Sequence, residues 1–166
     1  MYKVGEYVVK VNNGVCRVED IVDMALSGAG IKKYYLMVPK DDRNSKLYVP
    51  VDGENGNVRN VMNHDEAIDF IKRIPDMAQA TIESDKLREQ EYKAAIRSGS
   101  PEKLVGIIKN IHHRNMARSR VGKKNTTVDE RYFKMAENIL YSELAFALNR
   151  EKEEMLQLIN DVIGRI

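Results

Sequence analysis

The sequence has one cysteine, Cys16, and no tryptophan. A single thiol cannot form an internal disulfide, and cysteine-based zinc sites need at least two thiolates. The histidines do not compensate, because His112 and His113 are adjacent on an expected helix and point about 100° apart. We therefore expect neither a structural metal nor another cofactor.

Long apolar segments are also missing. No stretch approaches the roughly 18 apolar residues that a membrane-spanning helix requires. Residues 1–14 alternate apolar and polar side chains and lack the apolar core of a signal peptide. The composition, 43% hydrophobic and 31% charged, is typical of a folded protein with a well-solvated surface. We expect a cytoplasmic protein with no membrane partner.

The sequence has no large excess of either charge. Its 27 basic and 25 acidic residues give a net charge of +2. A protein that coats nucleic acid indiscriminately would be far more basic. Any contact with nucleic acid must therefore come from a local patch.

The signatures of common enzymes are absent. The sequence contains neither G-x-x-x-x-G-K-[ST] nor G-x-G-x-x-G, and Gly28 and Gly30 lie in an expected hairpin turn, where a phosphate cradle would not form. Neighbouring carboxylates such as Asp41 and Asp42 also fall in an expected turn. We therefore expect no enzymatic activity, and an enzyme with dispersed catalytic residues is the weaker alternative.

Up to about residue 61 the apolar residues follow a period of two, which predicts strands. The expected strands cover residues 7–11, 15–21, 34–38, 47–51 and 58–61. Turn-forming segments rich in Gly, Asn and Asp separate them, at residues 12–14, 27–30, 41–44 and 52–56. A flat sheet of this size could not bury its apolar face, so the pattern favours a small SH3-like or Tudor-like antiparallel β-barrel.

From Asn63 onward the period changes to about 3.6, which predicts helices. The expected helices cover about residues 63–74, 83–97, 101–116, 127–149 and 155–163. Asn63, with Glu66 three positions later, is the expected cap of the first helix. Ser100 followed by Pro101 marks the start of the third, and Thr127 with Glu130 forms an expected capping box for the fourth. The fold class is therefore α+β in two domains: a barrel over residues 1–62 and an all-α domain of about five helices over residues 63–166.

One basic patch stands out from the near-neutral background. Between residues 109 and 134 there are eight lysines and arginines against two acidic residues. Residues 119–126 in its middle are expected to form a loop, from which flexible cations reach phosphates. The alternative is a loop that is basic only for solubility. The candidate DNA contacts here are Arg114, Arg118, Arg120, Lys123 and Lys124.

A second, mixed surface lies on the helix expected at residues 83–97. Its cations are Lys86, Arg88, Lys93 and Arg97. Acidic residues interleave with them, and pairing between positions i and i+4 explains most of that pattern without DNA. Taken alone, these residues are weaker candidates for DNA contact than the basic patch.

Several segments resemble one known family. The similar segments are residues 2–9 and 13–18 at the start, the strand segments 35–39 and 47–51, and the helical segments 92–99, 104–110, 123–137 and 142–148. They are similar to segments of the CarD/CdnL family of bacterial transcription regulators. The first segments are also similar to the polymerase-interaction module of the transcription-repair coupling factor. The resemblance covers essentially the whole chain, and its specificity lies in the order of the segments.

The resemblance implies that the barrel binds the β subunit of bacterial RNA polymerase through an exposed strand. The matching positions are Met24, Lys46, Leu47, Tyr48, Val49 and Pro50. An edge strand added to a partner sheet supplies backbone hydrogen bonds, and alternate side chains supply specificity. Leu47 or Val49, whichever faces inward, is instead part of the barrel core. The resemblance further implies a protein associated with the nucleoid through the polymerase.

The resemblance also implies that the helical domain contacts promoter DNA at the upstream edge of the opening bubble. Family members use a tryptophan there as a wedge, and this sequence offers only Ile82 in the matching region. Lys86, Arg88, Lys93 and Arg97 match the DNA-facing helix of the family. We therefore expect a monomeric regulator of initiation whose grip on DNA is weak and directed to phosphates. The alternative is a protein–protein adaptor that never meets DNA.

Overall fold

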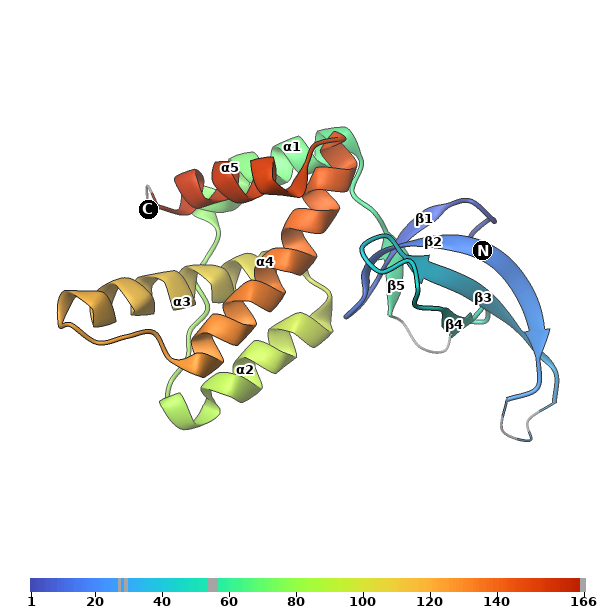
Figure 1. Ribbon diagram of the computed structural model, residues 1–166, viewed down its shortest axis with the longest axis horizontal. Helices are drawn as coiled ribbons and strands as arrows, with labels where there is room; N and C mark the ends of the chain where they lie inside the picture. Colours follow the sequence, from blue (N-terminus) through green and yellow to red (C-terminus); the bar gives the residue numbers. More distant parts are fainter. Residues whose placement is uncertain (27, 29, 54–56, 165–166) are drawn as a thin grey trace. The chain divides into compact units, whose positions relative to one another are not determined.

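The computed structural model describes residues 1–26, 28, 30–53 and 57–164 (Figure 1). The chain divides into two compact units, Met1–Val61, here called the sheet unit, and Met62–Ile166, here called the helical unit. The expected turns at 27–30 and 52–56 include residues 27, 29 and 54–56, which lie outside the described residues. Each unit is described by itself below.

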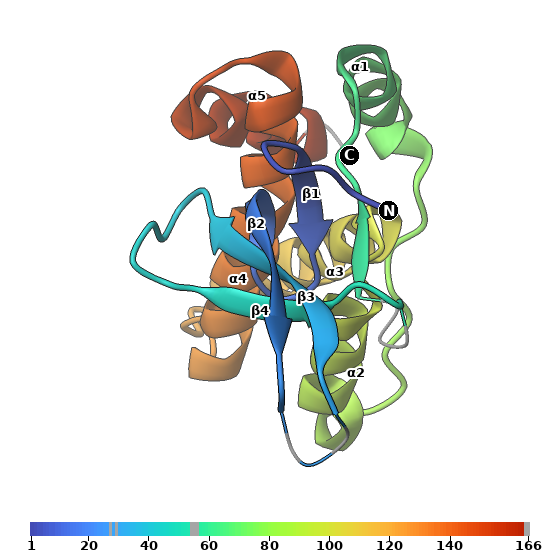
Figure 2. The same ribbon diagram turned by 90° about the vertical axis from the view of Figure 1, so that its right-hand side faces the viewer.

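The sheet unit is an antiparallel sheet whose strands are β1 (Tyr7–Lys10), β2 (Gly14–Met24), β3 (Lys32–Pro39), β4 (Leu47–Pro50) and β5 (Val58–Asn60). Their order is β4-β3-β2-β1-β5. Figure 2 shows how strongly the long strands β2 and β3 twist. The five-stranded antiparallel fold is confirmed, and the described pairings leave β4 and β5 as its two edges.

The core of the sheet unit is small. Its buried residues are Val8, Cys16, Val18, Tyr35, Met37 and Val49. Burial raises the pKa of the Cys16 thiol to about 11, so this cysteine stays protonated at neutral pH and acts as an apolar core residue. The sheet register shifts between Val18 and Asp20, where an irregularity of the β-bulge type increases the local twist.

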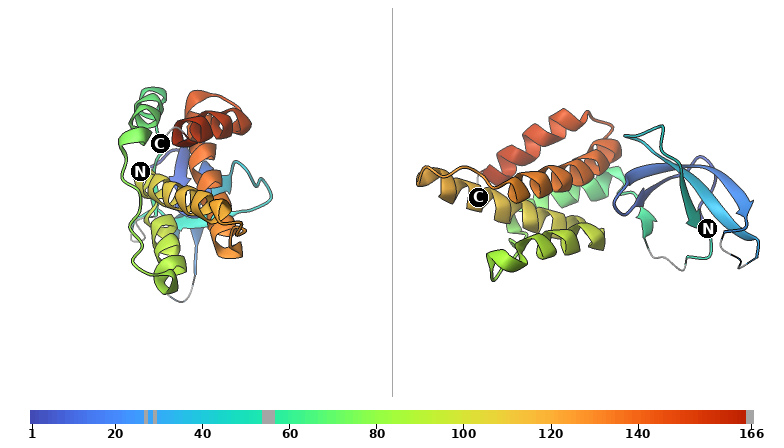
Figure 3. Two further views of the ribbon diagram at one scale, coloured as in Figure 1. Left: turned by 90° about the vertical axis from the view of Figure 1, so that its left-hand side faces the viewer. Right: turned by 60° about the horizontal axis from the view of Figure 1, so that its bottom comes forward.

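The helical unit contains α1 (His64–Arg73), the 3₁₀ helix η1 (Ile74–Asp76), α2 (Asp85–Ser98), α3 (Pro101–Arg120), α4 (Thr127–Leu148) and α5 (Lys152–Gly164), seen from two further sides in Figure 3. The five expected α-helices are confirmed. Asn63 caps α1 in a capping box with Glu66, and Ser100 caps α3 with Pro101 in its first turn. Both caps agree with the sequence pattern.

Two helix ends differ from the expectation. Helix α3 continues to Arg120, because residues 114–120 are mostly good helix formers and Gly122 is the first residue in the left-handed region. Ser119 and Arg120 are therefore helical and not part of the loop. The N-cap of α4 is Thr126, whose hydroxyl accepts a hydrogen bond from the Asp129 amide at 3.1 Å, so the cap lies one residue before Thr127.

A buried lysine joins two elements of the helical unit. Lys109 is 2% exposed, and its Nζ donates to the carbonyls of Ile74 at 2.6 Å, Pro75 at 3.2 Å and Met77 at 2.7 Å. These carbonyls lie where α1 and η1 end, so the ammonium group satisfies acceptors that a helix end leaves unpaired. Desolvation lowers the pKa of Lys109. One of the eight cations of the basic patch is therefore a structural residue.

Candidate functional site

The first candidate site is the free edge of the sheet unit at β4. Among the described residues, β4 pairs only with β3, with Tyr48 opposite Leu36. The Val51 amide donates to the Lys33 carbonyl at 3.0 Å. Because hydrogen-bonded and non-hydrogen-bonded pairs alternate along an antiparallel ladder, the N–H and C=O of Tyr48 point away from β3. Pro50 has no N–H, so Tyr48 carries the outward backbone donor of this short strand.

The side chains of β4 divide between the core and the solvent. Val49 is buried, and Leu47 is half-buried against the same core. The other face presents Tyr48, which is 44% exposed, and the neighbouring Lys46 is exposed as well. Leu47 and Val49 therefore both face the core, and the side chains of Lys46 and Tyr48 are exposed to solvent.

Met24 does not lie beside these residues. It ends β2, two strands away from β4, and its register partner is Lys32 at the start of β3. Two strand spacings are about 10 Å, and β4 pairs with β3 only over Tyr34 to Met37. Met24 is half-buried. The structure therefore separates Met24 from Lys46 and Tyr48, so it does not form one surface with them.

A hollow of about 770 Å³ lies next to the start of β4. Tyr7, Leu36 and Val38 contribute apolar side chains to its lining, while Arg43 and Lys46 contribute cations. Both cations are exposed. The exposed side of β4 therefore continues into a concave surface that combines apolar area with positive charge.

In the helical unit, two of the predicted DNA contacts belong to an internal polar network. Arg88 donates to the Tyr92 hydroxyl at 2.9 Å, to Asn110 Oδ1 at 2.8 Å and to Asp85 Oδ1 at 3.0 Å. Arg114 donates to the same Asp85 oxygen at 2.6 Å. The Arg88 and Arg114 side chains are only 13% and 21% exposed. Both guanidinium groups are thus held inside the unit.

Asp129 lies at the centre of this network and is fully buried. It accepts a hydrogen bond from the Tyr92 hydroxyl at 2.8 Å. Its other oxygen lies 2.8 Å from Arg114 Nε, in an ion pair without the alignment of a hydrogen bond. Burial, the main cause, raises the pKa of Tyr92 to about 12, so its hydroxyl remains a donor. The network joins the first turns of α2 and α4 to α3.

The hydrogen bonds to Arg114 and then Arg88 hold the pKa of the Asp85 carboxyl below its ordinary value. Asp85 is the first residue of α2, where the helix dipole also favours a negative charge. The carboxylate is therefore ionised at neutral pH and bridges the two arginines.

Arg118 has another internal role. Its Nε donates to the Lys124 carbonyl at 2.9 Å, across the loop that follows α3. Its own carbonyl accepts from the amides of Val121 at 3.2 Å and Lys123 at 2.9 Å. Arg118 therefore fixes the shape of the loop. The exposed cations in this region are Arg120, Lys123 and Lys124.

The remaining predicted contacts fall into two groups. Lys86, Arg120, Lys123 and Lys124 are exposed, and we call this group the basic end. The network places the first turns of α2 and α4 beside α3, and Figure 1 shows these turns and the last turn of α3 at the same end of the helical unit. The two helix N-termini at this end carry acidic side chains in their first turns, Asp85 on α2 and Asp129 and Glu130 on α4, so the positive charge of the basic end comes from its four side chains.

Lys93 and Arg97 lie farther along α2. Arg97 is twelve residues beyond Asp85, which is roughly 18 Å along a helix. Lys93 pairs with Glu89 at 3.4 Å, as i, i+4 pairing predicts. The structure thus separates these two cations from the basic end.

Ile82 is half-buried and packs against the core of the helical unit. A wedge side chain must leave the protein surface to reach a base step. The position that the resemblance assigns to the wedge therefore holds a residue that serves the packing of the segment before α2.

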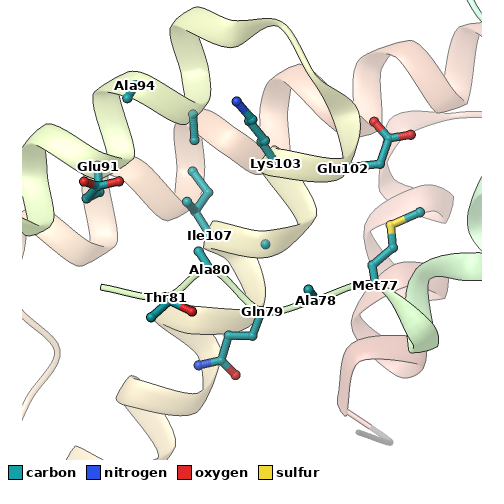
Figure 4. A pocket seen from close by; sticks show the side chains of 12 residues that line it. Met77, Ala78, Gln79, Ala80, Thr81, Glu91, Ala94, Glu102, Lys103 and Ile107 are labelled. Atoms are coloured by element: carbon teal, nitrogen blue, oxygen red, sulfur yellow. The ribbon is translucent and has the colours of Figure 1, made fainter. Parts of the chain in front are cut away.

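The same segment borders a half-open hollow of about 520 Å³ (Figure 4). Ala80 in the segment and Ala94 on α2 line it with small side chains, while Glu91 and Glu102 lie at its polar margin. The segment lies close to α3, because the Ala80 amide donates to the Gly106 carbonyl at 3.0 Å and a Cβ at Gly106 would approach the Ala78 carbonyl to 3.3 Å.

The described part of the chain contains no group of three or more His, Cys, Asp or Glu residues placed to hold a metal ion. Within the same residues, no helix is both long and apolar enough to cross a membrane.

Sequence reasoning missed the internal network. The spacing of Arg88 and Tyr92, four residues apart on a helix, was visible as a local pair. Asp129 lies between Thr127 and Glu130 in the expected helix start, and nothing in that local pattern indicates that its carboxylate is buried. No sequence signal pairs it with Tyr92, 37 residues away.

Two family models match the chain. The one described as CarD-like/TRCF RID domain matches residues 2–62, and the one described as CarD, C-terminal domain matches residues 71–160. These matches define the class of the protein as a non-enzymatic transcription factor that interacts with RNA polymerase. Within that class, the chain belongs to the CarD/CdnL family. No curated protein matches it.

Proposed function

We propose that this protein docks on the β subunit of bacterial RNA polymerase through β4 and contacts promoter DNA through the basic end, thereby modulating initiation. Residues 1–62 form the polymerase-interaction domain in this proposal, and residues 63–166 form the DNA-contacting domain. The single observation that supports it most directly is that, among the described residues, no strand pairs with the outer edge of β4.

Docking through β4 is supported by the chemistry of the strand. An extended partner segment completes the backbone hydrogen bonds that Tyr48 leaves open, and Tyr48 supplies a large side chain at the contact. The short length of β4 and Pro50 limit unspecific pairing of the same edge. The exposed Arg43 and Lys46 beside it favour a partner surface with acidic residues.

The docking proposal is tested by a pull-down with the isolated lobe of the β subunit. The full chain is immobilised, and we expect it to retain the lobe at 150 mM salt, which is about physiological ionic strength. A lobe that passes through unretained at this and at lower salt contradicts the docking proposal.

DNA contact is supported by the basic end, where Lys86, Arg120, Lys123 and Lys124 are exposed. Four cations neutralise only about four phosphates, so we expect weak binding that weakens further as the salt concentration rises. Fluorescence anisotropy on forked promoter DNA across a salt series tests this. The logarithm of the binding constant should fall linearly with the logarithm of the salt concentration. Binding that does not change with salt contradicts phosphate contact.

The second candidate function is an adaptor that binds the polymerase, or another partner, without DNA. One observation favours it: Arg88 and Arg114, predicted as DNA contacts, have their guanidinium groups engaged within the unit. In that case the pull-down succeeds and the anisotropy series shows no binding even at low salt. The two experiments together therefore separate the two functions.

A further inference from the structure

The loop at the end of α3 has a well-defined backbone. Gly122 adopts the left-handed region, with φ of +72°, and its amide donates to the Ser119 carbonyl at 3.0 Å. The Lys123 amide donates to the Arg118 carbonyl at 2.9 Å, and these two bonds form a Schellman-type helix end. Arg118 then fastens the Lys124 carbonyl. The loop is thus closed by hydrogen bonds on both sides of its tip.

An apolar side chain occupies this fixed tip. Val121, the C-cap residue of α3, is 69% exposed, more than any other large apolar side chain described in the helical unit. The next most exposed, Met116, is 45% exposed. Exposed single apolar residues are common, so exposure by itself indicates nothing. Val121 differs from other exposed apolar residues because it lies on a hydrogen-bonded helix end and is flanked by cations.

The surroundings of Val121 are cationic. Arg120 precedes it, Lys123 and Lys124 follow Gly122, and all three are exposed. The sequence contains no acidic residue between Arg114 and Val128. An anionic partner complements such a tip, and the phosphates on either side of a nucleic-acid groove supply closely spaced negative charges that the flanking cations can contact.

We propose that Val121 is an apolar insertion residue, which the basic end presses against a weakened base step of promoter DNA. The inference rests on the proposed DNA contact and adds its geometry. Proteins that bind the minor groove insert aliphatic side chains between base steps while flanking cations hold the phosphates. The hydrogen-bonded loop holds Val121 in place, so little conformational entropy is lost on contact.

The test compares two DNA substrates that share one sequence, a full duplex and the same duplex with a premelted segment, by anisotropy with the full chain. Unstacking is already complete in the premelted DNA, so an inserting residue gives it tighter binding. We expect the Val121→Ser variant to lose about fivefold in affinity for the premelted DNA, with little change for the duplex. The salt dependence should stay as in the unmodified protein, because no cation is removed.

Two matched variants control the experiment. Leu158→Ser removes a 42% exposed leucine from α5, away from the loop, and should change neither affinity. Val121→Ile keeps an aliphatic side chain and should retain the preference for premelted DNA. Amide spectra of each variant check that the fold is unchanged.

The outcomes distinguish the inference from the function on which it rests. If the Val121→Ser variant keeps the full preference for premelted DNA, or loses affinity equally for both DNA substrates, Val121 is not an insertion residue. The proposed DNA contact is unaffected by either result. If the unmodified protein binds neither substrate at low salt, the proposed DNA contact fails and takes the inference with it. The inference is also overturned if the protein binds vesicles of anionic lipid and the Val121→Ser variant loses this binding while its DNA binding is unchanged.

Discussion

The two units of this chain treat their polar groups in opposite ways. Among its described residues, the sheet unit leaves backbone groups of an edge strand open at Tyr48, and ion pairs such as that of Arg17 with Glu19 lie on its surface. The helical unit instead holds charged groups inside: Asp129 is fully buried and Lys109 is 2% exposed. One unit therefore leaves backbone groups of an edge strand exposed, and the other uses charged side chains to hold its helices together.

This difference shows where functional residues are to be sought in each unit. Surface ion pairs contribute little to stability, so the exposed charges of the sheet unit can be replaced at small cost. In the helical unit, a cation that looks available in the sequence can be a structural part, as Arg88 and Arg114 are. Only cations outside the network, such as Lys123, are free to serve a ligand.

The largest expected effect is the loss of stability of the helical unit when its buried carboxylate, Asp129, is removed. Replacing Asp129 with alanine leaves Arg114 and the Tyr92 hydroxyl without a buried partner, and breaking a buried pair in this way costs about 3–5 kcal/mol. We expect amide hydrogen exchange to show lost protection in the helical unit and unchanged protection in the sheet unit. Glu130→Ala, at the exposed neighbouring position, is the control and should cost little. Equal losses in both units would contradict the contrast drawn between them.

The next largest effect concerns the edge of the sheet unit. Tyr48→Glu places a carboxylate on the docking strand while the inward-facing Val49 keeps the core intact, so binding to the β lobe should fall at least about thirtyfold, as at an interface hot spot. Titration calorimetry measures it. Asn60→Glu places the same charge on the exposed part of β5, the opposite edge. Similar losses from both variants would show that charge alone, and not the β4 edge, governs binding.

A smaller effect is expected from the basic end. Lys124→Ala removes one phosphate contact, so the slope of the logarithm of the DNA-binding constant against the logarithm of salt concentration should become shallower by about 0.9. Arg97→Ala, at the distant part of α2, should leave the slope unchanged. A larger change from Arg97 than from Lys124 would move the DNA contact to the other part of α2.

The smallest effect is on acid stability. The carboxyl of Asp85 has a lowered pKa, caused first by Arg114, and that of Glu89 is lowered first by the Tyr132 hydroxyl. A carboxyl whose pKa is lower in the folded than in the unfolded chain stabilises the fold when it is ionised. This stabilisation is fully present above the pKa of the unfolded chain and is lost as the pH falls through the pKa of the folded chain. The helical unit should therefore lose stability below about pH 4. Asp85→Asn should flatten this part of the stability curve measured by urea unfolding, and a curve of unchanged shape would contradict the assignment.

Much of the fold followed from local patterns. Alternation of apolar residues predicted five strands, and the caps at Asn63 and Ser100 predicted two helix starts, because these signals act over a few residues. The end of α3 and the cap of α4 were misplaced. Both Thr126 and Thr127 suit an N-cap, and the buried contacts of Asp129 favour the register in which Thr126 caps.

The candidate sites followed less completely. The outward position of Tyr48 depends on the register between β3 and β4, and an error of one residue would reverse it. Alternation puts Leu47 and Val49 on one face of the strand and Tyr48 on the other, but which face is inward is decided by the packing of the sheet. The sequence pattern also does not predict the tight helix end at Val121. It predicts a loop over residues 119–126, and the hydrogen bonds that shape this segment are visible only in the structure.

The sequence by itself determined the division into a strand-rich and a helical part, the lack of a disulfide and the family to which the chain is similar. Composition, period and short motifs suffice for these properties. Tertiary structure decided which cations are free. Arg114 meets Asp85 29 residues away, and Lys109 meets the Ile74 carbonyl 35 residues away. Such pairs form only after the helices pack, because a buried charge must find its partner in space and not along the chain.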